Sequence, residues 1–307
     1  MDSMARIESA LSAAVASGEG LGCPPKLVAA VRHAVFPGGA RIRPQLCLAV
    51  AQACGDDDPA LADAAAVAVE LLHCASLVHD DLPCFDDATT RRGRASVHSA
   101  FGERLAVLAG DALIVNAFQT LALAGARSPQ RLVTLIATIG QGVGMPLGIV
   151  AGQAWECEPK VVLRDYQRAK TGALFAAATM AGAQAAGASA QPWRALGEWL
   201  GEAYQVADDL ADALGEAERL GKPIHQDGNK ARPNLVAKLG IDGAVKRLDA
   251  LLDQAMRSLP ECRGRESVED FLRLAAERLC PPALRRKDST AESTEGAETG
   301  KEGVSGS

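Results

Sequence analysis

The chain has 307 residues, of which 48% are hydrophobic, so it is long enough to bury a sizeable core. Its net charge of −6 at pH 7 argues against a surface whose main task is to bind nucleic acid. The eight cysteines show no CxxC or Cys/His metal spacing, and the first residues lack the basic and apolar segments of a secretory signal, so we expect a reduced, cytoplasmic compartment.

Helical patterns follow one another along the chain, and no alternating β-branched run predicts a sheet. Prolines at helix starts, such as Pro25, Pro59 and Pro129, mark several of the beginnings. Low aromatic content with abundant Ala and Gly favours helices that pack closely. The sequence therefore predicts an all-α domain over residues 1–284, with helices at about 25–35, 44–54, 59–79, 102–124, 129–140, 163–189, 192–219, 241–259 and 265–279.

Two further segments are interpreted as a tail and as a core helix. From about residue 285 the chain turns to Ser, Thr, Glu, Gly and Lys, which predicts a disordered tail over 285–307. Residues 173–190 form a long, weakly polar stretch, but Thr179, Gln184 and Ser189 interrupt it. Alanine is also a poor membrane residue, so we expect a core helix and no membrane span.

Two aspartate clusters are the most informative feature of the chain. Residues 80–87 read DDLPCFDD, and residues 208–212 read DDLAD. Several carboxylates so close together are unfavourable unless a cation neutralises them. Oxygen ligands without a thiolate or imidazole favour Mg²⁺, or Mn²⁺, which then shares its other positions with substrate phosphates and water. We therefore expect the clusters to form two walls of one site for a phosphorylated substrate.

Local geometry supports this interpretation. Asp208 and Asp212 are four residues apart on a predicted helix, so they share one face. Asp80 ends its helix, where the macrodipole disfavours anions. Pro83 then leads the chain off the helix, so that Asp86 can fold back toward Asp80. A local rule broken in this way favours a functional role for the segment.

Basic groups accompany both acidic clusters. Arg91 and Arg92 follow the first cluster, Lys170 and Lys222 bracket the second, and Arg43 precedes a helix start that can bind an anion. Each pair alone is compatible with a surface charge run. Together they predict two phosphate sites, one bridged by metal and one bound by Arg and His.

Several motifs of the chain resemble those of a known family. Between Gly38 and about Asp227 the chain contains, in order, GGARIRP, ELLHCASLVHDDLPCFD, RRG, FGERLAVLAGDAL, KTGALF, YQVADDLAD and GKPIHQD. This set resembles the trans-isoprenyl diphosphate synthases, and most of all the geranylgeranyl diphosphate synthases of bacteria that make carotenoids and bacteriochlorophyll. The resemblance implies an all-α bundle around a deep central cavity, usually homodimeric, with about three Mg²⁺ ions on an allylic diphosphate.

The resemblance also implies a role for each matching residue. Catalysis and metal binding fall to the acidic residues and one lysine: Asp80, Asp81, Asp86, Lys170, Asp208, Asp209 and Asp212, with Asp80, Asp86, Asp208 and Asp212 as metal ligands. The allylic diphosphate and its cation are served by Arg91, Lys170, Thr171, Gln205 and Lys222. Isopentenyl diphosphate is held by Arg43, His73 and Arg92. Without the resemblance, a core histidine would be the ordinary interpretation of His73.

Two further features of the sequence concern the choice of substrate and the length of the product. The family usually has Lys after the two glycines, where this chain has Ala40, which removes an expected contact to isopentenyl diphosphate. The product must extend along the helix that ends at Asp80, where Ala75 and Ser76 are small and Leu72 is a candidate for the floor. One helical turn rises about 5.4 Å, close to one isoprene unit, so this helix can act as a ruler.

The expected reaction is therefore condensation of isopentenyl diphosphate with dimethylallyl, geranyl or farnesyl diphosphate to give the C20 product. Three alternatives remain open from the sequence. The first is a synthase that stops at farnesyl or geranyl diphosphate. A class I terpene cyclase would need the same metals but no isopentenyl site, against which Arg43, His73 and Arg92 argue. A non-catalytic partner subunit would be expected to lose acids from one motif, and both motifs are intact.

Overall fold

The computed structural model describes residues 2–36, 38–214 and 235–279. Lys222, the segment 221–227 and the predicted tail from 285 lie outside the described residues. Most of the described chain is helical. The elements in order are α1 (Ser3–Ser17), α2 (Pro25–Val35), α3 (Ile42–Ala53), α4 (Pro59–Asp80), β1 (Thr90–Arg91), β2 (Arg94–Ala95), α5 (Val97–Phe101), α6 (Glu103–Gly125), α7 (Pro129–Val143), α8 (Ile149–Ala154), η1 (Trp155–Cys157), α9 (Leu163–Gln167), η2 (Arg168–Gly172), α10 (Ala173–Ala185), η3 (Gln191–Trp193), α11 (Arg194–Ala213), α14 (Leu235–Arg257) and α15 (Arg265–Leu279).

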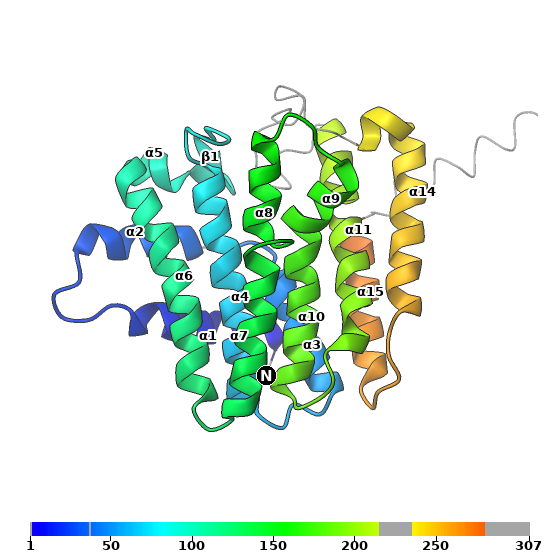
Figure 1. Ribbon diagram of the computed structural model, residues 1–307, viewed down its shortest axis with the longest axis horizontal. Helices are drawn as coiled ribbons and strands as arrows, with labels where there is room; N and C mark the ends of the chain where they lie inside the picture. Colours follow the sequence, from blue (N-terminus) through cyan, green and yellow to red (C-terminus); the bar gives the residue numbers. More distant parts are fainter. Residues whose placement is uncertain (1, 37, 215–234, 280–307) are drawn as a thin grey trace, which may run out of the picture.

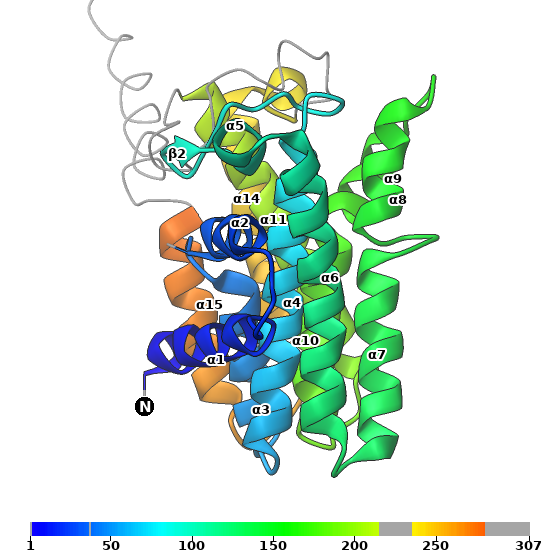
Figure 2. The same ribbon diagram turned by 90° about the vertical axis from the view of Figure 1, so that its left-hand side faces the viewer.

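The long helices stand side by side, and α4 and α10 lie at the centre of the bundle (Figure 1). α4 packs against α3, α6 and α10, whereas α11 packs against α10 and α14. The short N-terminal helices α1 and α2 lie across the upright helices on one side (Figure 2). This arrangement brings the C-terminal ends of α4 and α11 to the same end of the bundle.

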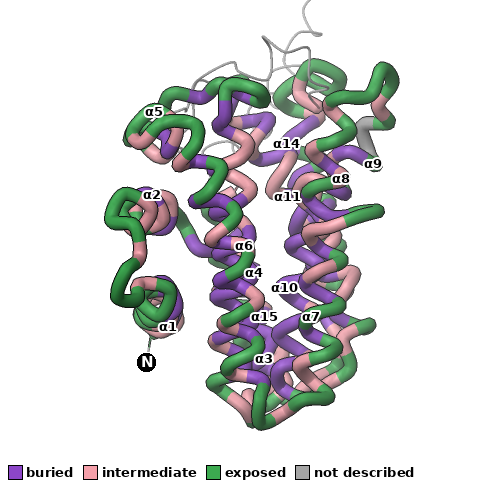
Figure 3. Tube along the Cα trace, turned by 60° about the vertical axis from the view of Figure 1, so that its left-hand side comes forward, coloured by how far each residue is buried: buried purple, intermediate pink, exposed green. Residues whose placement is uncertain are grey.

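α4 is the core helix because it is apolar around its whole circumference. Asp58 caps its N-terminus by accepting the Leu61 N–H, and Pro59 follows in the first turn. Nearly every residue from Leu61 to Val78 is buried. Figure 3 shows this buried centre along α3, α4 and α10, with exposed residues at the ends of the bundle. The core thus fixes the axis that carries the first aspartate cluster.

The expected all-α class is confirmed, and several boundaries differ from prediction. α1 was not predicted, although Ile7, Leu11, Ala14 and Val15 bury one face of it. The expected helix over 163–189 is wrong in detail, because a π-helical turn divides it and Gly187, at φ 72°, follows its end. β1 and β2 form one two-residue antiparallel ribbon within the described chain. A ribbon of this length gives no alternating pattern that a sequence could reveal.

Two helices, α4 and α6, are long and apolar enough to cross a membrane by length and composition alone. In α4 the most apolar window is 78% buried, which is typical of a core helix. In α6 the corresponding window is only 39% buried, so one apolar side of α6 faces outward. The expected core helix α10 is buried along most of its length.

Candidate active site

The first aspartate cluster closes α4 with a tight reversal of the chain. The Asp86 N–H donates to the Asp80 carbonyl oxygen at 2.9 Å, and the Ala88 N–H donates to that of Asp81 at 3.1 Å. Pro83 lies in the turn between them, so the chain returns over the helix end as expected. Asp80 and Asp86 consequently line the same cavity.

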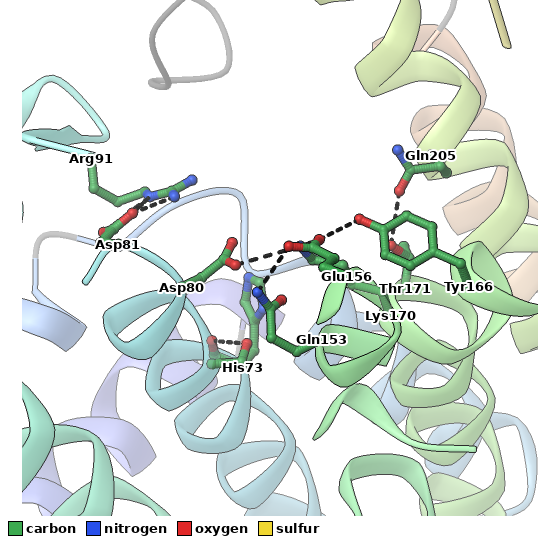
Figure 4. Close-up of polar contacts among 11 residues, drawn as sticks. His73, Asp80, Asp81, Arg91, Gln153, Glu156, Tyr166, Lys170, Thr171 and Gln205 are labelled. Atoms are coloured by element: carbon green, nitrogen blue, oxygen red, sulfur yellow. Dashed lines mark hydrogen bonds and ion pairs between the residues drawn. The ribbon is translucent and has the colours of Figure 1, made fainter. Parts of the chain in front are cut away.

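Asp81 faces another way from its neighbour. It is buried and accepts hydrogen bonds from the guanidinium of Arg91, with the Arg91 Nε 3.0 Å from the Asp81 Oδ1 (Figure 4). Burial raises the pKa of Asp81, against the opposing effect of Arg91, and the same ion pair raises the pKa of Arg91 despite its burial. Asp81 therefore anchors Arg91, which itself lines the cavity.

The second aspartate cluster lies on the last turns of α11. Asp208 and Asp212 both line the cavity, as their spacing predicted. Asp209 points elsewhere: it is buried, accepts the Gln205 side-chain N–H at 3.1 Å, and accepts the Leu235 N–H at 2.8 Å. Asp209 thus links α11 to α14 and does not line the cavity.

A third wall comes from α8, η1, α9 and the π-helical turn η2. Lys170 extends from η2 toward the first cluster, with its ammonium 3.4 Å from the Asp80 Oδ1. The Thr171 hydroxyl donates to the Gln205 side-chain oxygen at 2.9 Å and so joins this wall to α11 (Figure 4). π-helical turns occur often at functional sites, and this one places Lys170 and Thr171 side by side in the cavity wall.

Arg43 and His73 form a basic corner of the cavity. The Arg43 guanidinium lies 3.3 Å from the His73 Nε2 and 4.4 Å from the ring centroid of Phe175. Burial, and then the positive charges of Arg43 and Arg92, hold the pKa of His73 well below its usual value. His73 is therefore neutral at pH 7. Burial also lowers the pKa of Arg43, and its Nε is buried without a hydrogen-bond partner among the described residues.

These walls enclose one cavity of about 660 Å³. It brings together most of the described residues that the sequence singled out: Arg43, His73, Ser76, Asp80, Asp86, Arg91, Arg92, Lys170, Thr171, Gln205, Asp208 and Asp212. Ala75 and Leu72 are buried in the core below it and are not among its lining residues. Lys222 lies outside the described residues.

Arg41 and Ala40 belong to the motif GGARIRP at the start of α3, which contributes both to core packing and to the cavity. Arg41 adopts a left-handed conformation (φ 49°), and its buried guanidinium contacts Glu70 at 2.7 Å and Glu8 at 2.8 Å. Arg41 therefore stabilises the packing of α1 and α4 and cannot replace the lysine missing at Ala40. Ala40 itself is exposed. Arg43, the second residue of α3, is the arginine of this motif that reaches the cavity.

The donor set fits Mg²⁺ shared with a substrate. All four candidate ligands provide carboxylate oxygens, the type that this cation prefers. Among the described residues no three His, Cys, Asp or Glu side chains form a ready-made metal cluster. Carboxylates on separate walls fit a cation that completes its coordination with diphosphate oxygens and water, as Mg²⁺ commonly does.

Sequence reasoning did not single out Gln153, Tyr166 and Tyr204, which line the cavity, or Glu156, which contacts Lys170 in its wall. Glu156 accepts the Lys170 ammonium at 2.6 Å and is the most informative of them. It is a single acid on a three-residue 3₁₀ turn, so no spacing or periodicity distinguished it. Tyr204 was visible only as an apolar neighbour of the second cluster.

Comparison with known proteins agrees with this geometry. Residues 24–270 match the polyprenyl synthetase family. The geranylgeranyl diphosphate synthase of Cereibacter sphaeroides is 57% identical, over 90% of this chain and 96% of its own length. That of Rhodobacter capsulatus is 55% identical, over 89% and 95%. A geranyltransferase from Helicobacter pylori, solved in complex with magnesium and isoprenyl diphosphate, superposes with a TM-score of 0.75 at 28% identity, over 90% of this chain and 98% of that one. The chain belongs to the polyprenyl synthetase family.

Proposed function

We propose that this protein is a Mg²⁺-dependent prenyltransferase that condenses isopentenyl diphosphate with dimethylallyl, geranyl or farnesyl diphosphate to give geranylgeranyl diphosphate. One observation carries the proposal. The aspartates of α4 and α11 line a single cavity together with the basic corner of Arg43 and His73. A site for a metal-bound diphosphate and a site for a second diphosphate therefore adjoin each other. The two relatives above 50% identity favour the C20 product.

Asp80, Asp86, Asp208 and Asp212 would hold the metal, about three Mg²⁺ ions by family resemblance. When bound, Mg²⁺ supplies Lewis-acid withdrawal of charge from the diphosphate leaving group. The four carboxylates provide the negative charge that offsets the cations in a partly enclosed cavity. Without the cations these acids would repel one another and the substrate alike.

The allylic diphosphate lies between the α4 end and the η2 wall. Lys170 and Thr171 from η2, Gln205 from α11 and Arg91 beside Asp81 provide its hydrogen-bond donors. They orient the allylic C–O bond, which breaks with its electron pair leaving on the diphosphate. Lys222 is assigned to the same substrate by its motif alone. The lining of apolar and aromatic side chains keeps water from the resulting carbocation.

Isopentenyl diphosphate binds at the basic corner. Arg43 and Arg92 donate charge-assisted hydrogen bonds to its diphosphate. His73 is neutral, so it donates one further hydrogen bond without adding a charge that would repel the arginines. Held in this way, the isopentenyl double bond attacks the allylic carbon, a C–C bond forms, and a proton is lost from the adduct. Both diphosphates are thereby positioned before reaction, which lowers the entropic part of the barrier.

We also propose that the protein is a cytoplasmic homodimer. Large apolar side chains on α6 and α7 are exposed along one side of the bundle, namely Val107, Leu108, Val115, Leu123, Val133 and Ile136. On α6 they recur at seven- and eight-residue spacing and so share a face. An apolar patch of this kind is typical of a protein–protein interface. A second copy of the chain would cover it and remove its apolar surface from water.

One assay tests the proposed function. Purified protein is incubated with Mg²⁺, isopentenyl diphosphate and each allylic starter in turn, and the products are hydrolysed and sized by chromatography. The expected product is C20 from all three starters. A C15 or C10 end product would identify a shorter-chain synthase. Absence of any condensation product would overturn the proposal.

A further inference from the structure

The carboxylate of Glu156 accepts hydrogen bonds from three parts of the cavity wall. Its Oε1 accepts the Lys170 ammonium at 2.6 Å and the Tyr166 hydroxyl at 2.6 Å, and its Oε2 accepts the Gln153 amide at 3.2 Å. Figure 4 shows Glu156 between Asp80 on one side and Tyr166 on the other. Gln153 and Tyr166 therefore hold the carboxylate in a fixed orientation, and Lys170 meets an acceptor that is already oriented.

The Lys170 ammonium is shared between two carboxylates. It lies 2.6 Å from Glu156 and 3.4 Å from Asp80, so the contact with Glu156 is the closer of the two. All three side chains are largely shielded, with 16–20% of each exposed. In such surroundings charge–charge attraction is stronger than in open water. The position of the ammonium is consequently set more by Glu156 than by Asp80.

The backbone fixes the distance between these two elements. A methyl group added to Gly152 would lie 2.4 Å from the Lys170 backbone nitrogen, so α8 rests directly on the π-helical turn. Glu156 follows Gly152 by four residues, one turn further along the same segment. The glycine contact therefore places Glu156 opposite the end of the Lys170 side chain.

We propose that Glu156 is a positioning residue that holds the Lys170 ammonium at the cavity wall and keeps it from closing on Asp80. The proposal deepens the proposed function, because Asp80 must be available to a cation and Lys170 to a diphosphate. Without the Glu156 carboxylate, Lys170 would form a closer pair with Asp80. Magnesium would then have to displace that pair, and the lysine would have moved away from its place beside the diphosphate.

The test is a double-mutant cycle read out by binding. Isothermal calorimetry measures the dissociation constant of inorganic pyrophosphate in the presence of Mg²⁺ for the wild type, Glu156→Gln, Lys170→Ala and the double variant. Glu156→Gln should weaken binding by about tenfold, the scale of one hydrogen bond to a charged group. In the Lys170→Ala background the same substitution should have almost no effect, because its partner is gone.

Turnover assays provide a second measure. Glu156→Gln should raise the half-saturating Mg²⁺ concentration and the KM for the allylic substrate, and leave the KM for isopentenyl diphosphate unchanged. Glu158→Gln is the matched control, since it removes the same charge from an exposed residue two positions away. It should leave every one of these constants unchanged.

The outcomes separate the two proposals. If wild-type protein forms no prenyl product, the proposed function fails, whatever the variants do. If the wild type is active but Glu156→Gln weakens binding equally with and without Lys170, then Glu156 does not act through Lys170 and the inference is overturned. An equal effect of Glu158→Gln would overturn it too, because general electrostatics would then account for the change.

Discussion

Asp80 and Asp208 stand at the ends of different helices and line one cavity. Replacement of either residue by alanine should therefore lower turnover by several orders of magnitude, because each removes a ligand from a site whose charge neutralisation accounts for several kcal/mol of the barrier. Steady-state condensation assays measure the effect, and excess EDTA should mimic it in the wild type.

Asp165→Ala is a suitable control for both variants, since Asp165 is an exposed acid on the neighbouring helix α9. It should retain wild-type activity. Undiminished turnover in either Asp80→Ala or Asp208→Ala, or in the presence of EDTA, would show that the two clusters do not share one metal-bound substrate.

Ala40 is exposed and precedes Arg43 of the basic corner by three residues. Because Arg41 is turned inward to Glu8 and Glu70, it does not compensate for the missing lysine. Ala40→Lys should therefore lower the KM for isopentenyl diphosphate. A well-placed charge-assisted contact would add up to about 1.5–3 kcal/mol to the free energy of binding this substrate. The allylic KM should stay nearly constant. A raised KM for isopentenyl diphosphate would show that the lysine crowds the corner and that Ala40 is an adaptation.

The burial of His73 makes the stability of the folded state depend on pH. Its pKa in the folded state lies well below its usual value, mainly through burial. In the unfolded chain a histidine titrates near pH 6.5, so below that pH the unfolded state binds more protons and stability falls as the pH falls. His73→Gln should lose less stability than the wild type between pH 7 and pH 5. Denaturant unfolding at both pH values measures the difference, and equal losses would contradict the prediction.

Among the helices, α4 carries candidate metal ligands at its C-terminal end and also borders the space expected for the product. Ser76 and Leu77 line the cavity one turn before Asp80, whereas Ala75 lies buried beside them. Ala75→Tyr would place an aromatic ring at this level, so we expect a C15 main product with activity retained. Product chromatography gives the answer. Overpacking of a buried position typically costs about 1–3 kcal/mol, so the melting temperature should fall modestly.

Ser76→Phe is the matched variant, because Ser76 already faces the cavity. If Ala75→Tyr still forms mainly C20 while Ser76→Phe forms C15, the ruler follows the face of α4 that carries Ser76. If both variants form C20, product length is not set by this helix.

Element by element, the sequence predicted the fold wherever a helix had a clear start and a buried face. Pro59 and the apolar run after it predicted α4 to within one residue. The spacing of Asp208 and Asp212 predicted their shared face on α11. The return of Asp86 to Asp80 followed from Pro83. Each of these depends on local geometry alone, which the order of residues determines directly.

Other features depend on contacts between distant segments, and no local pattern revealed them. The division of the expected helix over 163–189 places Lys170 on a π-helical turn against Gly152. The role of Glu156 appears only when α8, α9 and η2 come together. Arg41 and Arg43 are two residues apart in one motif, yet one supports the core and the other the cavity. Only tertiary packing decides which direction each side chain takes.

At the scale of the whole molecule, the apolar side of α6 and α7 remains unexplained by the fold of one chain. Leu123 is 74% exposed and Val133 is 68% exposed, although both are large and apolar. None of the described residues that line the cavity belongs to α6 or α7, so this side is not required for the substrate. The proposed homodimer would account for it, since two copies would bury the same surface against each other.

Val115 lies near the middle of that side of α6 and is 55% exposed. In a dimer, Val115→Glu would bury a carboxylate without a partner on each side of the interface, which costs several kcal/mol. We therefore expect a monomer by size-exclusion chromatography with light scattering, with unchanged helical circular dichroism. Leu274→Glu is the control, because Leu274 is 56% exposed on α15, away from α6 and α7 (Figure 2). If Val115→Glu stays dimeric while Leu274→Glu dissociates, the interface lies on the other side of the bundle. If the wild type is itself a monomer, the homodimer proposal is wrong.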